Sequence, residues 1–175
     1  MNTSPEKSAQ NATLGLGGNL GDPIQAMASA LRILDARNDC SVVAVSRLYR
    51  TPPWGKTDQS FFFNACAELQ TTLTPEKLLD VCLDVERKMK RERTERWGPR
   101  TLDIDILTYG DLVQATPQLI IPHPRMTERG FVLMPLSDIA PDLRIEGQTV
   151  VEWLSKADIE GIEIAEEERN WWRRT

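Results

Sequence analysis

Residues 61–89 read FFFNACAELQTTLTPEKLLDVCLDVERKM, and this stretch decides the fold. Residues 61–71 alternate in character with a period of two, which is typical of a half-buried strand. The alternation gives one strand face to Phe63, Ala65, Ala67 and Leu69, and the other to Phe62, Asn64, Cys66 and Glu68. After Thr74-Pro75, which is a helix start, apolar residues recur at helical spacing in one stripe, Leu78, Cys82, Val85 and Met89. The stretch therefore predicts a strand followed by an amphipathic helix.

The segments on either side complete a pattern. Residues 12–16 predict a strand that ends at Gly17-Gly18-Asn19, and Asp22 and Pro23 predict the start of a helix. Residues 41–49 are β-branched and predict a strand, residues 51–55 are proline-rich and predict a loop, and residues 101–109 predict a further strand.

The resulting order is β-α-β-β-α-β, which is typical of an α+β, ferredoxin-like antiparallel sheet with both helices packed on one face. We expect the opposite face to be free for a site. Beyond this unit, prolines fix the segment 120–124, residues 131–136 are apolar and residues 150–154 predict a short helix. The rest of the chain is a C-terminal extension.

Length and composition limit the possible classes of protein. A chain of 175 residues suits one domain, and we expect a disordered N-terminal extension over 1–11, a single domain over 12–157 and an acidic C-terminal tail over 158–175. The net charge of −5 argues against a nucleic-acid partner. The polar N-terminus and the absence of a long apolar run predict no membrane partner and a cytoplasmic location. We also expect a monomer.

Residues 96–107, RWGPRTLDIDIL, contain the strongest chemical signal. Asp103 and Asp105 are two residues apart on a predicted strand, so they share a face with their Cα atoms about 6.5–7 Å apart. Such a carboxylate pair suits Mg²⁺ that bridges to substrate phosphates. Five cations precede or adjoin the strand in an otherwise acidic chain: Lys90, Arg91, Arg93, Arg96 and Arg100. The pattern predicts a metal and phosphate site, although an isolated Asp-x-Asp is more often a solvated strand face paired with arginines.

The motifs of this chain together resemble the 6-hydroxymethyl-7,8-dihydropterin pyrophosphokinase family. The blocks that carry the resemblance occur in family order between about residues 14 and 142: LGGNLGD, YRTPP, FFNA, RWGPRTLDIDIL, IPHPRM and RGFVLMPL. The resemblance implies transfer of a pyrophosphoryl group from ATP to the pterin hydroxymethyl in folate biosynthesis. It implies the substrates ATP and 6-hydroxymethyl-7,8-dihydropterin, with two Mg²⁺ ions as cofactors.

The resemblance also implies roles for individual residues. Asp103 and Asp105 would hold both Mg²⁺ ions, and the catalytic group would be Arg91, Arg100, Asp103 and Asp105. The pterin would contact Thr51, Pro53, Trp54, Phe62, Asn64, Trp97 and Phe131. ATP would contact Gln70, Glu86, Arg93, Ile106, His123 and Arg129. Phe62 and Asn64 make physical sense in this role, because a flat ring can stack on the heterocycle while the amide reads its polar edge.

The chain departs from the family pattern at one point before the predicted metal site, and two other interpretations stay open. Met89-Lys90 replace a residue followed by glycine in the family pattern, so we expect the preceding helix to run further. Two other readings remain open: a palm-type nucleotidyltransferase, which also places paired carboxylates on a ferredoxin-like sheet, and a ferredoxin-like RNA-binding module. The first gives no reason for Phe62 and Asn64, and the second needs a basic surface with exposed aromatic residues.

Overall fold

The structure is a computed structural model that describes residues 8–52, 60–91 and 102–174. Its centre is a six-stranded antiparallel sheet in the order β10-β3-β4-β1-β5, and β2 pairs with β4 beside β3. The strands are β1 (Gln10–Gly18), β2 (Cys40–Val45), β3 (Leu48–Thr51), β4 (Phe62–Thr71), β5 (Asp103–Tyr109) and β10 (Glu163–Glu166). Without β10, the strand order is that of a ferredoxin-like fold, so the predicted fold class is confirmed.

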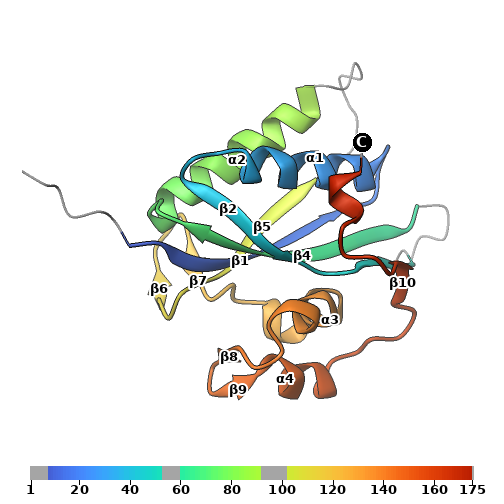
Figure 1. The fold of residues 1–175 in the computed structure, drawn as a ribbon. Coiled ribbons are helices and arrows are strands. Elements are labelled where there is room, and N and C mark those ends of the chain that lie inside the picture. The colour runs from blue at the N-terminus through green and yellow to red at the C-terminus, as the bar shows by residue number, and fades with distance from the viewer. Residues whose placement is uncertain (1–7, 53–59, 92–101, 175) are drawn as a thin grey trace, which may run out of the picture.

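One face of the sheet is covered by α1 (Pro23–Asp35) and α2 (Pro75–Arg91), which lie side by side above it in Figure 1. The Asp22 side chain caps α1 by accepting a hydrogen bond from the Gln25 amide, as the sequence predicts. Buried aliphatic residues of β1, β4 and β5 pack against both helices in one continuous core. Helix α2 continues through Met89-Lys90 to Arg91, in agreement with the expectation of a longer helix.

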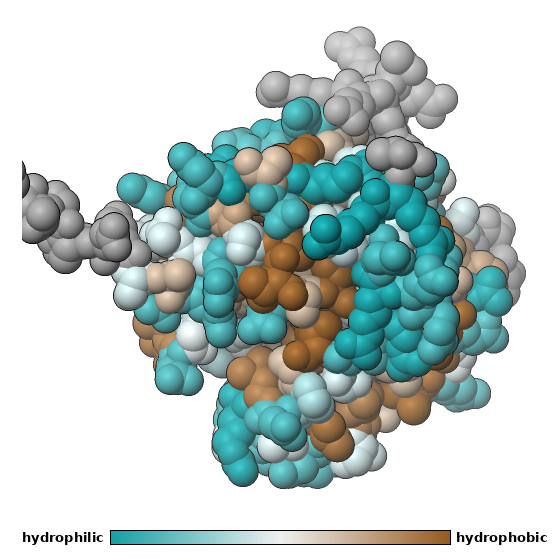
Figure 2. Space-filling view, viewed as in Figure 1, coloured by the Kyte–Doolittle hydropathy of each residue, from teal (hydrophilic) through white to brown (hydrophobic). Residues whose placement is uncertain are grey.

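The opposite face is only partly open, so the expectation of a wholly free face is wrong. Helices α3 (Gly130–Ile139) and α4 (Val150–Lys156) lie below the sheet in Figure 1 and form a second core with Cys66 and Leu107. Hydrophobic residues gather between the sheet and these helices in the middle of the surface in Figure 2. The sequence signal for α3 is weak because the helix is short and contains Pro135.

Short elements connect these layers. They are β6 (Gln114–Ala115), β7 (Ile120–Ile121), β8 (Arg144–Ile145) and β9 (Gln148–Thr149), with the 3-10 turns η1 (Met126–Glu128) and η2 (Trp171–Arg173). The β6-β7 and β8-β9 pairs are separate two-stranded sheets. Within the described part of the chain, no helix has the length and apolar character needed to cross a bilayer.

The strand predicted over residues 41–49 is interrupted and forms both β2 and β3. At the interruption, the Ser46 amide donates to the Cys66 carbonyl, and the Cys66 amide donates to Ser46 Oγ, each at 2.9 Å. A side-chain oxygen thus replaces a backbone acceptor of the ladder. Local alternation in the sequence does not reveal such a substitution, because Ser46 also fits a continuous strand.

The C-terminal segment packs against the fold. Strand β10 pairs with β3, and Trp171 and Trp172 are buried in the core on the α1 side of the sheet. Arg32 of α1 donates hydrogen bonds to the carbonyls of Trp172 and Arg174 at 2.9 and 3.1 Å. The expectation of an acidic tail did not anticipate this packing, because the acidic residues mask the two tryptophans in the composition of the segment.

Candidate active site

A pocket of about 580 Å³ lies at one end of the partly open sheet face, beside the N-terminal end of α3. Seven of the residues predicted for the site line it: Thr51, Phe62, Asn64, Asp103, Asp105, Arg129 and Phe131. They come from β3, β4, β5 and the start of α3, which are distant in sequence. The pocket therefore brings together four of the predicted pterin residues, Thr51, Phe62, Asn64 and Phe131, and both predicted metal ligands.

One wall of the pocket is built by β4 and its neighbours. Phe62 is 36% exposed, and Asn64 lies two residues further along the same strand face. Gly17 of β1 pairs with Asn64, and a Cβ atom added at position 17 would lie 2.7 Å from Asn64 Oδ1. Only glycine therefore leaves the Asn64 amide in its present place. Thr51 pairs with Phe62, and its buried hydroxyl has no hydrogen-bond partner within the described ranges.

The opposite wall is built by β5. Its two carboxylates are exposed, whereas Ile104 and Ile106 between and after them are buried against the helices. In the ladder with β1, Asp105 lies opposite Gly15 and Asp103 opposite Gly17. The absence of side chains on these two glycines leaves space in front of the carboxylates. The sheet thus holds two anionic groups on one face, as the strand period predicts.

The donor set at this wall can be tested against a magnesium ion. Among the described side chains, no group of three or more His, Cys, Asp or Glu residues is arranged to hold a metal. Two carboxylates alone form an incomplete ligand set. Mg²⁺, however, commonly takes one or two carboxylates and completes its shell with waters and substrate phosphates. Asp103 and Asp105 therefore fit Mg²⁺ that arrives with a polyphosphate.

The start of α3 contributes a cation and a ring. The Arg129 guanidinium lies 5.6 Å from the centroid of the Phe131 ring, and both residues line the pocket. Nearby, His123 Nδ1 accepts a hydrogen bond from the Arg125 amide at 3.2 Å. Burial lowers the pKa of His123, and the Asp105 carboxylate opposes this shift. Because Nδ1 accepts the hydrogen bond from the Arg125 amide, Nε2 is the ring nitrogen left to donate.

Glu86 and Ile106, two of the predicted ATP residues, lie outside the pocket lining at the edge of the sheet, and His123 is likewise not among the lining residues. The Ile104 amide donates to Glu86 Oε1 at 2.7 Å, and burial raises the pKa of Glu86, with Asp103 and Asp105 adding to the rise. Because backbone groups repeat every second residue along a strand edge, the Ile106 amide points in the same outward direction as that of Ile104. Glu86 thus binds a backbone amide at the outer edge of β5, next to Asp103 and Asp105.

Gln70 is not brought to this pocket. It lies near the other end of β4 and lines a separate polar hollow with Thr13, Glu68 and Thr108. The ATP role of Gln70 stays a prediction, and its place in the structure gives that role no support. Its side chain shares a strand face with Asn64 and Glu68, but the face is long enough to serve two different hollows.

Other predicted residues lie outside the described ranges. These are Pro53, Trp54, Arg93, Trp97 and Arg100. Arg91 is the last residue of α2, and its side chain is likewise outside the description. The pocket also has lining residues that the sequence analysis did not assign, including Gly15, Gly17, Asn19, Cys66 and Val132. Gly15 and Gly17 could have been found from the sequence, because alternate glycines in a predicted strand indicate that a ligand or another segment comes close to the strand face.

The fold and the pocket define a class: an α+β protein with a small-molecule site on a ferredoxin-like sheet. The family model of 7,8-dihydro-6-hydroxymethylpterin-pyrophosphokinase (HPPK) matches residues 13–141. A Methylorubrum extorquens protein named 2-amino-4-hydroxy-6-hydroxymethyldihydropteridine pyrophosphokinase is 50% identical over 155 residues, 89% of this chain and 98% of that protein. A Pseudomonas aeruginosa protein of the same name is 43% identical over 88% of this chain and 96% of that protein. The chain belongs to the HPPK family.

A solved structure supports the fold assignment independently. Wild-type Plasmodium falciparum HPPK-DHPS superposes with a TM-score of 0.69 over 87% of this chain and 42% of that chain. The two sequences are 19% identical in this comparison. At this level of identity the likeness concerns the fold, whereas the family assignment follows from the sequence matches.

Proposed function

We propose that this chain transfers a pyrophosphoryl group from ATP to 6-hydroxymethyl-7,8-dihydropterin, which gives AMP and the pterin diphosphate in tetrahydrofolate biosynthesis. Membership of the HPPK family supports the reaction and its two substrates. The observation that carries the proposal at the level of the site is the single pocket shared by Phe62, Asn64, Asp103 and Asp105. Neither a nucleotidyltransferase nor an RNA-binding module explains that combination.

The pterin occupies the end of the pocket formed by β3, β4 and α3. The Phe62 and Phe131 rings contact the faces of the heterocycle, and the Asn64 amide donates to and accepts from its polar edge. In the sequence-based assignment, Thr51, Pro53, Trp54 and Trp97 complete this end. The placement of Phe62 and Asn64 on one strand face supports their shared role.

ATP occupies the end of the pocket formed by β5 and the residues that precede α3. Asp103 and Asp105 would hold two Mg²⁺ ions, which would neutralise charge on the ATP phosphates when bound. His123 and Arg129 contact phosphate oxygens, and backbone groups of Ile106 contact the adenine. Glu86 and Arg93 are the further nucleotide-side residues of the proposal. Arg91 and Arg100 stabilise the negative charge that develops during transfer.

The chemistry needs positioning rather than a protein nucleophile. The pterin hydroxyl oxygen attacks the β-phosphorus, the bond from that phosphorus to the oxygen of the α-phosphate breaks, and AMP leaves with the bond electrons. The hydroxyl proton passes to solvent. The two pocket walls hold the reacting oxygen and the phosphate chain in line, and the apolar rings exclude water that would otherwise hydrolyse ATP.

The remaining expectations concern the state of the protein in the cell. We propose a monomer in the cytoplasm that has no nucleic-acid or membrane partner. The net charge of −5 supports the absence of a nucleic-acid partner. The division into an extension over 1–11, a domain over 12–157 and a tail over 158–175 also stays a prediction.

The function is tested by the identity of the nucleotide product. The purified protein is incubated with Mg-ATP and 6-hydroxymethyl-7,8-dihydropterin, and AMP, ADP and pyrophosphate are separated and quantified. We expect AMP formation that depends on the pterin, with one pterin diphosphate for each AMP. Release of pyrophosphate without a pterin diphosphate would instead favour a nucleotidyltransferase, and no pterin-dependent product would contradict the proposal.

A further inference from the structure

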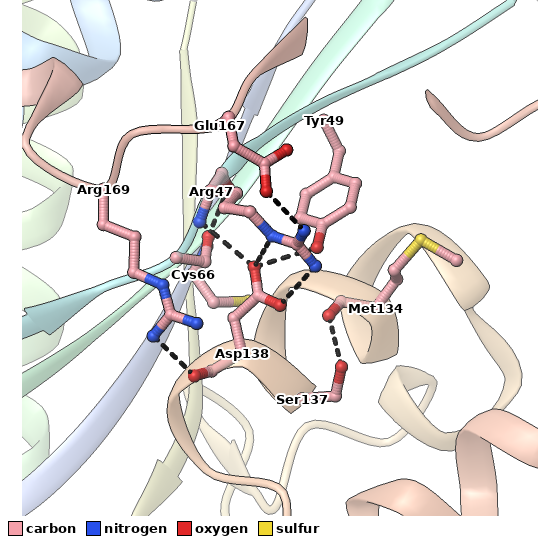
Figure 3. Close-up of polar contacts among 9 residues, drawn as sticks. Arg47, Tyr49, Cys66, Met134, Ser137, Asp138, Glu167 and Arg169 are labelled. Atoms are coloured by element: carbon pink, nitrogen blue, oxygen red, sulfur yellow. Dashed lines mark hydrogen bonds and ion pairs between the residues drawn. The ribbon is translucent and has the colours of Figure 1, made fainter. Parts of the chain in front are cut away.

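A buried carboxylate outside the pocket ties together two elements that form its pterin end. Asp138, near the end of α3, has a side chain that is only 6% exposed. Its Oδ2 atom accepts hydrogen bonds from the Arg47 amide, Arg47 Nε and the Tyr49 hydroxyl at 3.1, 3.2 and 2.8 Å. Its Oδ1 atom accepts from Arg47 Nη2 at 3.1 Å. Figure 3 shows how these donors converge on the one carboxylate.

The hydrogen-bond partners of Asp138 compensate the negative charge of its carboxylate. Hydrogen bonding to Asp138 raises the pKa of Arg47 above its ordinary value, so the guanidinium stays charged. Burial and the same carboxylate raise the pKa of Tyr49 to about 12, so its hydroxyl remains a donor at every physiological pH. A buried carboxylate with a charged guanidinium partner and two further donors, the Arg47 amide and the Tyr49 hydroxyl, resists separation, because removing one charged partner leaves the other charge uncompensated.

The two elements that Asp138 joins both reach the pocket. Tyr49 of β3 lies opposite Asn64 in the ladder with β4, and Thr51 at the end of the same strand lies opposite Phe62. At the other end of α3, Phe131 and Val132 line the pocket. Asp138 itself does not belong to the lining. It is seven residues from Phe131, which corresponds to about 10 Å along the helix.

The C-terminal segment holds the same helix at both ends. At the start of α3, a Cβ atom added at Gly130 would lie 2.2 Å from the Asp158 carbonyl oxygen, so the segment lies directly against the helix backbone. At the far end, Arg169 Nη1 donates to the Asp138 carbonyl at 2.9 Å, and Glu167 pairs with Arg47 at 3.2 Å. These contacts limit both sliding and tilting of α3 relative to β3.

From this geometry we infer that Asp138 is a positioning residue for the pterin end of the pocket, acting through Tyr49 and α3 on Asn64 and Phe131. The inference rests on the proposed function, because the pterin is the ligand whose binding it concerns. Asp138 holds the strand that adjoins Asn64 and the helix that carries Phe131 at a fixed separation. Asp103 and Asp105 lie on β5, which β4 and β1 separate from β3.

The test compares two Michaelis constants in one variant. Asp138→Asn preserves the shape of the side chain but removes its charge and replaces one acceptor with a donor. We expect KM for the pterin to rise about 10-fold to 100-fold, as for a misplaced binding group. KM for ATP should rise by a clearly smaller factor, because Arg129 adjoins α3 whereas Asp103 and Asp105 lie on β5. A purely structural role would lower the amount of active enzyme without changing the ratio of the two constants.

Two further variants make the test decisive. Tyr49→Phe removes a single donor from Asp138, and it should shift the ratio of the constants in the same direction by a smaller factor. Tyr49→Phe also tests the positioning role of Asp138 by itself if Asp138→Asn does not fold. Asp35→Asn is the matched control, because Asp35 Oδ1 likewise accepts a backbone hydrogen bond, from the Val42 amide at 2.9 Å, on the other side of the sheet. Its ratio should equal that of the wild type.

The outcomes separate the two proposals. A wild-type enzyme that makes AMP in a pterin-dependent way, together with raised pterin KM in Asp138→Asn and Tyr49→Phe only, supports the positioning role. An active wild type with an unchanged ratio in both variants overturns the positioning role and leaves the proposed function intact. A wild type without pterin-dependent AMP overturns the proposed function and, with it, the positioning role.

Discussion

The two faces of the central sheet differ although they share the same strands. On the face toward α1 and α2, the alternate residues Ala65, Ala67 and Leu69 of β4 are almost fully buried in an unbroken apolar core. On the other face, Phe62 and Asn64 border a pocket, and Cys66 packs against α3. The comparison shows how the pocket arises. Helix α3 covers the middle of one sheet face, and the end of that face stays open.

The first prediction concerns the two carboxylates that line the pocket on β5. Asp103→Ala or Asp105→Ala should lower kcat by at least about 100-fold, because charge stabilisation of the transferred group would be lost. The thermal unfolding midpoint should change little, since both side chains are exposed. Asp111→Ala, which removes a carboxylate lining the other hollow of the same face, is the control and should retain activity. A loss of fold in proportion to activity would contradict the site role.

The second prediction concerns the apolar core on the other face, between the sheet and helices α1 and α2. Leu78 of α2 is completely buried in the core, and Leu78→Ala should lower the free energy of unfolding by about 2–5 kcal/mol through lost burial and a cavity. KM for both substrates should stay unchanged in the folded fraction at low temperature. Urea denaturation and initial-rate kinetics measure the two effects. An altered KM without loss of stability would show that the two faces are not separable in this way.

The third prediction concerns the two glycines of β1 that line the pocket. In Gly17→Ala the new Cβ atom would displace the Asn64 amide, and KM for the pterin should rise about 10-fold, which corresponds to one or two lost hydrogen bonds. Gly15→Ala is the matched control on the same strand face. Its Cβ atom would meet Leu107 at an ordinary 3.5 Å. Equal effects of both substitutions would argue against a specific role for Asn64.

Much of the sheet and its helices follows from local patterns. The period of two in residues 61–71 and the stripe from Leu78 to Met89 predict β4 and α2 because both elements have one buried face. The interruption at Ser46 depends on a hydrogen bond to Cys66. The burial of Trp171 and Trp172 depends on contacts with residues distant in sequence, such as Arg32 and Ser46. Such tertiary determinants have no period in the sequence. They decide the boundaries and the C-terminal packing.

The same division applies to the site. Asp103 and Asp105 could be placed on one face from strand period alone, and Phe62 with Asn64 likewise. The meeting of these two pairs in one pocket depends on the order of β4, β1 and β5 in the sheet, which the ferredoxin-like order of the predicted elements indicates. Gln70 was assigned to ATP by the resemblance alone, and it lines a separate hollow near the other end of β4.

The fourth prediction is the smallest and concerns alkaline pH. The folded state keeps the Tyr49 proton up to a pKa of about 12, whereas the unfolded chain releases it near 10. The stability that this group contributes is therefore present below pH 10 and is lost as the pH rises toward 12. The advantage of wild type over Tyr49→Phe in unfolding free energy should shrink over this range by at most about 2 kcal/mol. A constant difference would contradict the buried, hydrogen-bonded state of the hydroxyl.

The central claim is that one pocket on the partly open face holds the pterin at its Phe62 end and the nucleotide at its Asp103 and Asp105 end. Initial rates of pterin-dependent AMP formation by Phe62→Ala, measured against each substrate in turn, test it most directly. We predict that KM for the pterin rises at least about 10-fold, because the ring contact is lost, while KM for ATP stays near the wild-type value. An equal rise in both constants would contradict the division of the pocket into two ends.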